Sequence, residues 1–130
     1  MTERYRDGGG AESAAAYSRA VRSGAFVAVS GTAATGPDGR ALHENDTYAQ
    51  TRECFERALA GLEALGGSVD DVIRTRILLA PEADPKGAIR VHRELFEGRE
   101  PANTTFYVAG FIPEGVLVEV ELDAVVAEDA

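Results

Sequence analysis

The sequence is poor in the residues that form disulfides and metal sites. Cys54 is the single cysteine, so one chain cannot form an internal disulfide. The two histidines, His43 and His92, lie far apart and match no metal-ligand spacing. We therefore expect no cysteine-clustered zinc site, no other metal centre and no cofactor.

Positive charge and long apolar runs are also scarce. The chain of 130 residues has 13 Lys and Arg side chains against 22 Asp and Glu side chains, a net charge of -9. This excess of negative charge disfavours non-specific binding to nucleic-acid phosphates or anionic lipid. No apolar stretch reaches the about 20 residues that cross a bilayer, and residues 1–11 are polar. We therefore expect a cytoplasmic protein with neither a nucleic-acid nor a membrane partner.

The rest of the composition is that of one globular domain. Hydrophobic residues make up 45% of the chain and charged residues 27%, and 130 residues is a typical length for a single core. The residues before Tyr17 include a glycine run from Gly8 to Gly10 and have little apolar surface to bury. We predict a flexible lead-in over residues 1–16 and a single domain over residues 17–130.

Patterns of apolar residues predict the elements of this domain. Segments rich in Val, Ile, Phe and Tyr indicate strands, and apolar residues at three- and four-residue spacing indicate helices. Asn45-Asp46 and Asp84-Pro85 are typical helix starts. Strands are expected over residues 17–22, 26–32, 72–79, 103–111 and 116–126, and helices over residues 48–65 and 85–96. This order favours an α+β fold in which two helices pack on one face of a mostly antiparallel sheet.

Alternation along the predicted strands sorts their side chains onto two faces. In the last strand every second residue from Val116 to Ala124 is apolar, and the opposite side carries Glu119, Glu121 and Asp123. In the other strands the side chains expected to face the helices include Ile73, Ile77, Leu79, Phe106 and Val108. The face left uncovered by the helices is then expected to carry Tyr17, Arg19, Arg74, Arg76, Asn103, Thr105 and Tyr107 as well as the three acids.

Two interpretations of this uncovered face stay open. The arginines can pair with the acids on an ordinary solvated face, where each pair stabilises the fold little. Alternatively, the face is buried in a symmetric oligomer and the arginines bind a ligand, because Arg and Tyr are enriched at interfaces and Arg binds carboxylates through two parallel hydrogen bonds. The second interpretation predicts a site made by two subunits.

Other candidate sites have simpler interpretations. Cys54 lies near the apolar stripe of the first predicted helix, which is typical of a packed thiol rather than a nucleophile. His92 lies on the inner side of the second helix, where a core histidine is favoured over a general base. The segment from Gly31 to Gly36 lacks a following Gly-Lys-Ser/Thr, so a structural turn is favoured over a phosphate loop.

Several motifs, taken together, indicate a family. They are Phe26–Gly31 (FVAVSG), Gly36–Gly39 (GPDG), Ser68–Thr75 (SVDDVIRT), Pro101-Ala102 and Val116–Glu121 (VLVEVE). From residue 17 to residue 126 the chain resembles the RidA/YjgF family of reactive-intermediate deaminases. The resemblance implies a chorismate-mutase-like fold and a homotrimer whose sheets line a central barrel, with a cleft between neighbouring subunits.

The resemblance also implies which residues form the site. Tyr17, Gly31 and Thr105 stand where the family has a site tyrosine, a backbone glycine and a cysteine or similar residue. Glu119 stands at the place of the glutamate that holds the hydrolytic water. Glu119 is therefore the expected catalytic residue, since a carboxyl in a partly desolvated cleft can have its pKa raised toward the working pH.

One residue departs from the family pattern. Asn103 stands in the place of the arginine that binds the substrate carboxylate, and an asparagine can hydrogen-bond that group but brings no charge. This change disfavours deamination of 2-aminoacrylate. Arg19 and Arg76 are the candidates to bind substrate from the same face, or else they pair with its acids.

The expected function is acid-base chemistry, either hydrolysis or tautomerisation, on a small reactive imine, enamine or related metabolite of a specialised catabolic or biosynthetic pathway. The alternative is a non-catalytic, regulatory trimer that binds a small metabolite in the cleft, so whether the chain is an enzyme stays open. Ribonuclease activity, which is also ascribed to the family, is disfavoured by the net charge of -9.

Overall fold

The computed structural model describes residues 2–127 and contains a six-stranded sheet and three α-helices. The strands are β1 (Thr2–Tyr5), β2 (Ala20–Ser23), β3 (Phe26–Ala33), β4 (Val72–Leu79), β5 (Ala102–Tyr107) and β6 (Val118–Val125). The helices are α1 (Gly10–Ala15), α2 (Thr47–Ala64) and α3 (Pro85–Phe96), and a 3-10 turn, η1 (Val69–Asp71), precedes β4.

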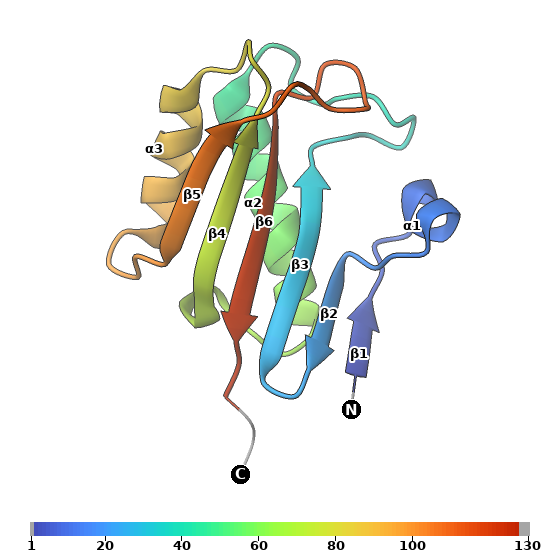
Figure 1. Cartoon of the computed structure of the whole chain (residues 1–130), viewed down its shortest axis with the longest axis vertical. Coiled ribbons are helices and arrows are strands. Elements are labelled where there is room, and N and C mark those ends of the chain that lie inside the picture. Colours follow the sequence, from blue (N-terminus) through green and yellow to red (C-terminus); the bar gives the residue numbers. More distant parts are fainter. Residues whose placement is uncertain (1, 128–130) are drawn as a thin grey trace.

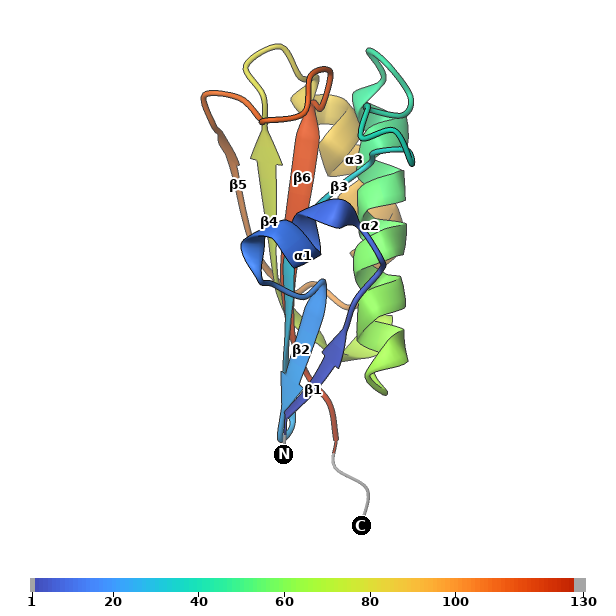
Figure 2. The same ribbon diagram turned by 90° about the vertical axis from the view of Figure 1, so that its right-hand side faces the viewer.

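The sheet has the strand order β1-β2-β3-β6-β4-β5 (Figure 1). The pairs are antiparallel except for β4 with β5, which run parallel. Helices α2 and α3 lie together on one side of the sheet (Figure 2). The predicted α+β fold, with two helices on one face of a mostly antiparallel sheet, is confirmed. We call the other side, which α2 and α3 leave uncovered, the open face.

Side-chain caps set where the two long helices begin. Asp46 precedes α2, and its side chain accepts a hydrogen bond of 2.9 Å from the backbone N–H of Ala49. Asp84 does the same for Lys86 of α3, with Pro85 at the first helical position. No helix within residues 2–127 is long and apolar enough to cross a bilayer.

The hydrophobic core lies between β6 and the helices. Every second residue of β6 from Val118 to Ala124 is fully buried against side chains such as Phe55 and Leu62 of α2. Burying one such side chain contributes about 1.5–3 kcal/mol to folding. The prediction for this strand is confirmed, because its acidic residues occupy the alternate positions and face away from the core.

The N-terminal segment contains more structure than its composition suggests. β1 pairs antiparallel with β2, and α1 follows within the stretch that the sequence predicts as a lead-in. The strand predicted from Tyr17 begins at Ala20 instead. Hydrophobic patterning misses β1 because backbone pairing holds it in place while most of its side chains stay exposed. The division into residues 1–16 and 17–130 stays a prediction.

The structure corrects the predicted faces of β5. Asn103 is the register partner of Thr75, a buried residue on the helix side, so Asn103, Thr105 and Tyr107 do not lie on the open face. Phe106 lies there instead, 39% exposed. The apolar Phe106 misled the assignment because β5 is an edge strand, whose alternation does not separate a buried from a solvated side.

A register irregularity corrects a second assignment, at the start of β4. The pairing of β4 with β6 shifts between Val72 and Arg74. Val72 is buried there, whereas Ile73, which the sequence assigns to the helix side, is 50% exposed. A shift of this kind interrupts strict alternation, so a simple parity rule fails at that point.

Candidate functional site

The site residues implied by the sequence fall into two separate groups. The first, which we call the glutamate cluster, surrounds the end of β3 and consists of Tyr17, Arg19, Gly31 and Glu119. Glu119 lies at the open face, whereas the stem of Arg19 lies beside α2, 3.5 Å from the place that a methyl group on Gly61 would take. The second, which we call the amide chain, crosses from β5 to α3 on the helix side and consists of Thr105, Asn103, Thr75 and His92. Arg76 belongs to neither group.

Glu119 lies half-buried on β6, between Ala33 of β3 and Leu78 of β4. Its carboxylate occupies space that a side chain at residue 31 would fill, because a methyl group built on Gly31 would lie 2.7 Å from Glu119 Oε1. Burial raises the pKa of Glu119; nearby Arg19 opposes this shift and the charge of Glu121 adds to it. The result is a carboxyl that holds a proton more readily than one in free solution.

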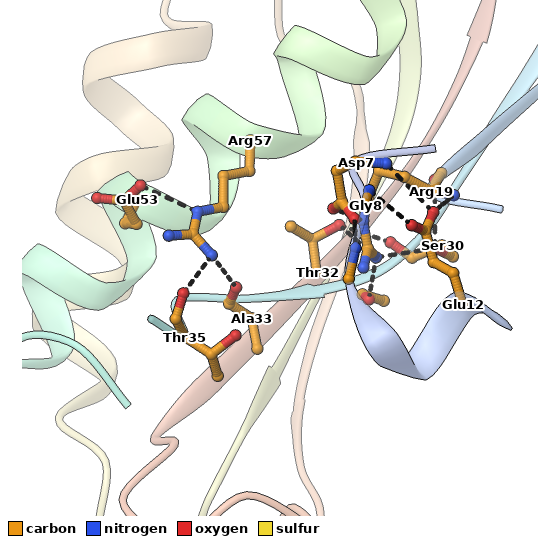
Figure 3. A network of polar contacts seen from close by, with 12 residues as sticks. Asp7, Gly8, Glu12, Arg19, Ser30, Thr32, Ala33, Thr35, Glu53 and Arg57 are labelled. Atoms are coloured by element: carbon orange, nitrogen blue, oxygen red, sulfur yellow. Dashed lines mark hydrogen bonds and ion pairs between the residues drawn. The ribbon is translucent and has the colours of Figure 1, made fainter. Parts of the chain in front are cut away.

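Arg19 fixes the backbone next to this carboxylate. The register between β3 and β6 shifts between Val29 and Thr32. At this irregularity Arg19 Nη1 donates to the carbonyl of Gly31 at 2.6 Å and to Ser30 Oγ at 2.9 Å (Figure 3). The Arg19 guanidinium also lies 5.8 Å from the centre of the Tyr17 ring. Arg19 therefore fixes the irregular part of β3 in which Gly31 lies against Glu119.

The partner acid of Arg19 is Asp7. Arg19 Nε donates to Asp7 Oδ2 at 2.9 Å, and the Arg19 side chain is only 11% exposed. Burial alone would raise the pKa of Asp7, but hydrogen bonds from Arg19 and from the N–H of Gly9 lower it overall. Neither of the two open alternatives anticipated this pair, because Asp7 lies in the predicted lead-in.

A second acid, Glu12 of α1, connects the N-terminal segment to Arg19. The buried carboxylate of Glu12 accepts hydrogen bonds from the backbone N–H groups of Gly8 at 3.1 Å and Arg19 at 2.8 Å (Figure 3). Farther along the chain, Arg57 of α2 donates to the carbonyls of Ala33 and Thr35. The end of β3 is thus held by two sets of polar contacts, from residues that carried no recognisable motif in the sequence.

The arginines of β4 pair with the acids of β6. Arg76 Nη1 lies 3.4 Å from Glu121 Oε1 and 3.7 Å from Asp123 Oδ2, and Arg74 Nε lies 3.9 Å from Asp123 Oδ2. These distances support the interpretation of Arg74 and Arg76 as partners of the acids. Such partly exposed pairs stabilise a fold by only about 0–1 kcal/mol, so they can be exchanged for a ligand at little cost.

The amide chain is continuous across three elements. Thr105 Oγ1 donates to Asn103 Oδ1 at 2.9 Å, and Asn103 Nδ2 donates to Thr75 Oγ1 at 3.0 Å. Thr75 Oγ1 lies 2.7 Å from His92 Nε2, and His92 packs against Phe55 and Phe96. Burial lowers the pKa of His92. Sequence analysis missed Thr75 because a threonine in a strand has no distinguishing signal.

The described residues offer neither a reactive thiol nor a metal site. Cys54 is fully buried, as the packed-thiol interpretation predicts, and burial raises its pKa to about 12, which leaves the thiol uncharged. Within residues 2–127, no group of three or more His, Cys, Asp or Glu side chains gathers closely enough to hold a metal ion.

Comparisons with known proteins are consistent with this arrangement. A model of the Endoribonuclease L-PSP family matches residues 10–126. The Streptomyces coelicolor protein SCO2049 is 38% identical over 121 residues, 93% of this chain and 90% of that protein. The RutC family protein PH0854 of Pyrococcus horikoshii is 32% identical over 105 residues, 81% of this chain and 82% of that protein. The crystal structure of Rv2704 from Mycobacterium tuberculosis, a member of the YjgF/YER057c/UK114 family, superposes with a TM-score of 0.87 at 35% identity, covering 97% of this chain and 100% of that chain.

Proposed function

Because the chain belongs to the RidA/YjgF family, which the Endoribonuclease L-PSP model describes, we propose that it is a cytoplasmic enzyme that hydrolyses or tautomerises a small imine or enamine. The observation that carries the proposal is the half-buried carboxyl of Glu119, packed against Gly31 with its pKa raised. A carboxyl in this state can take a proton from one atom and return it to another near the working pH.

In a hydrolysis, Glu119 holds the attacking water and accepts its proton. The water oxygen bonds to the carbon of the C=N group, and the electron pair of that bond moves to nitrogen. Glu119 then returns the proton to the nitrogen, which gives a carbinolamine. In a second transfer Glu119 takes the proton of the new hydroxyl group and delivers it to the nitrogen, so that the C–N bond breaks, the C=O bond forms and ammonia or an amine leaves. In a tautomerisation, the same carboxyl moves a proton between carbon and nitrogen.

The assembly we propose is a homotrimer with its sites between subunits. Glu119 lies at the open face, whereas Asn103 and Thr105 lie on the helix side, so one chain does not bring them together. A neighbouring subunit could supply the second group to the first. The open face also exposes apolar side chains, including Phe26 and Phe106, whose burial would stabilise such contacts.

The substrate we propose lacks a carboxylate. Asn103 carries no charge, and both ends of its carboxamide are engaged within the chain. Arg19 is held by Asp7, and Arg76 by Glu121 and Asp123. Charge-assisted anchoring of a carboxylate is therefore weakened, which favours a neutral or cationic imine.

The test is release of ammonia and carbonyl product from enzymatically generated imines, with Glu119→Gln as the diagnostic variant. We expect kcat/KM to fall about 10²–10⁴-fold, the usual contribution of a general acid-base. Glu121→Gln is the matched control, because Glu121 lies on the same strand and face. Unchanged turnover in Glu119→Gln would remove the catalytic assignment.

A second candidate function is non-catalytic metabolite binding. Two observations favour it: Asn103 brings no charge to bind a substrate, and the guanidinium of Arg19 is already paired with Asp7. Ligand-induced thermal stabilisation without product release in the same panel of imines would support it. Activity gained by Asn103→Arg would instead show that only the cationic anchor is missing.

A further inference from the structure

The hydrogen-bond chain from Thr105 to His92 has a direction that can be assigned. A threonine hydroxyl donates one hydrogen bond, and an amide NH₂ group only donates. Asn103 Nδ2 points at Thr75 Oγ1, so Thr75 must place its own proton elsewhere. His92 Nε2, at 2.7 Å, is the acceptor at hand. His92 is then neutral, with its ring proton on Nδ1.

The same direction holds at the other end of the chain. Thr105 Oγ1 donates to Asn103 Oδ1, so its proton is used inside the subunit. Thr105 therefore offers only oxygen lone pairs to a ligand. The amide orientation has further support from the backbone, because the carbonyl oxygen of Thr75 lies 3.5 Å from Asn103 Nδ2 and would face Asn103 Oδ1 if the carboxamide were turned over.

The surroundings of His92 favour its neutral form and still leave it in reach of solvent protons. The rings of Phe55 on α2 and Phe96 on α3 pack against it. A groove of about 330 Å³ beside it is lined by the charged side chains Arg93, Glu97 and Glu100, and Arg93 pairs with Glu97 at 3.2 Å. From β4 and β5 the facing groups are the uncharged Thr75 and Asn103.

We propose that His92 is a positioning residue that sets, through Thr75, whether Thr105 accepts or donates a hydrogen bond in the cleft. When His92 takes a proton, Nε2–H donates to Thr75 Oγ1 and Thr75 donates to Asn103 Oδ1. The carboxamide turns over, and Nδ2 donates to Thr105 Oγ1. The proton of Thr105 is then free for a ligand. The effect on substrate rests on the proposed function, since it requires Thr105 to line the substrate cleft.

Nuclear magnetic resonance of the uniformly ¹⁵N,¹³C-labelled full chain tests the relay without a substrate. We expect neutral His92 to carry its proton on Nδ1, with a titration midpoint below the ordinary value of about 6.5. The side-chain NH₂ signals of Asn103 should shift with the same midpoint. Either a proton on Nε2 of neutral His92 or constant Asn103 signals through the titration would overturn the proposal.

Three variants sharpen this test. Thr75→Val keeps the branched shape in the strand but removes the hydroxyl, so His92 should titrate while the Asn103 signals stay constant. Thr75→Ser restores the hydroxyl and should restore the coupling. His43→Gln removes the other histidine and should leave the coupling between His92 and Asn103 unchanged. If Thr75→Val does not fold, the His92 tautomer and the Asn103 titration in the unmodified protein still decide the outcome.

The relay and the proposed function can fail separately. If His92 and Asn103 titrate together but no imine is turned over, the relay is supported and the proposed enzymatic function is wrong. In an active enzyme, KM should vary with pH across the His92 midpoint, and this variation should disappear in Thr75→Val. A KM profile that Thr75→Val leaves unchanged would show that the relay does not reach the substrate.

Discussion

At the scale of single residues, the contact between Gly31 and Glu119 places the candidate catalytic group. The absence of a side chain at residue 31 lets the Glu119 carboxylate lie against the backbone of β3. Partial burial there raises the pKa of Glu119. The acidity of this group thus depends on a neighbour that contributes no functional atom of its own.

Gly31→Ala should separate activity from stability. The added methyl group would lie 2.7 Å from Glu119 Oε1, and a carboxylate at the end of a flexible side chain can move away. We expect a small change in Tm but a fall in kcat/KM of about 10²-fold, as misplacement by about 1 Å commonly causes. Gly10→Ala, where no atom lies within 4 Å, is the control. Full activity in Gly31→Ala would contradict this role.

At the scale of elements, β1 and α1 act as a brace for the end of β3. Asp7, which lies between β1 and α1, binds the side chain of Arg19, and Glu12 of α1 accepts a hydrogen bond from its backbone N–H. Arg19 in turn donates to the carbonyl of Gly31. The site geometry therefore depends on a segment whose composition suggests a flexible lead-in. Its three glycines and several alanines are typical of a flexible segment, although a few polar groups hold this one in place.

Removing the Glu12 carboxylate should loosen this brace. In Glu12→Ala the backbone N–H groups of Gly8 and Arg19 lose their acceptor, and leaving such groups unpaired costs about 1–3 kcal/mol. We expect a lower denaturant midpoint in chemical unfolding together with reduced kcat/KM. Glu3→Ala, an exposed position on β1, serves as the matched variant and should change neither quantity. Equal stability of the two variants would argue against a brace.

At the scale of the whole molecule, the sheet separates the two halves of the proposed site. Glu119 and the amide chain lie on opposite faces, and no rearrangement of side chains within one chain can join them. The open face carries charge pairs that are easily exchanged and several exposed apolar side chains. Both features fit a face that another copy of the chain covers.

Sedimentation of the purified chain tests this assembly. We expect a particle with three times the mass of one chain at micromolar concentration. Phe106→Asp would place a charge on the open face and should shift the particle toward monomers, with loss of turnover although Glu119 is unchanged. Ile112→Asp, in an exposed loop, should change neither the mass of the particle nor its turnover. A monomeric wild-type chain would contradict the intersubunit cleft.

The sequence by itself determined the two long helices, the α+β order of elements from β2 onward and the acidic side of β6. These features depend on local periodicity and on caps such as Asp46 and Asp84, which act over a few residues. The motifs from residue 17 onward also predicted the family correctly. Glu119 was placed beside the open face by alternation alone, because β6 is buried on one side along its whole length.

Only the tertiary structure decided which groups the polar residues contact. Whether Arg19 binds Asp7 or an acid of β6, and on which face Asn103 lies, depends on how distant segments pack and on the register of an edge strand. Alternation cannot give this information where both sides of a strand are exposed or where the register shifts. The path from Thr105 to His92 likewise exists because β5, β4 and α3, which are separate in the sequence, pack side by side.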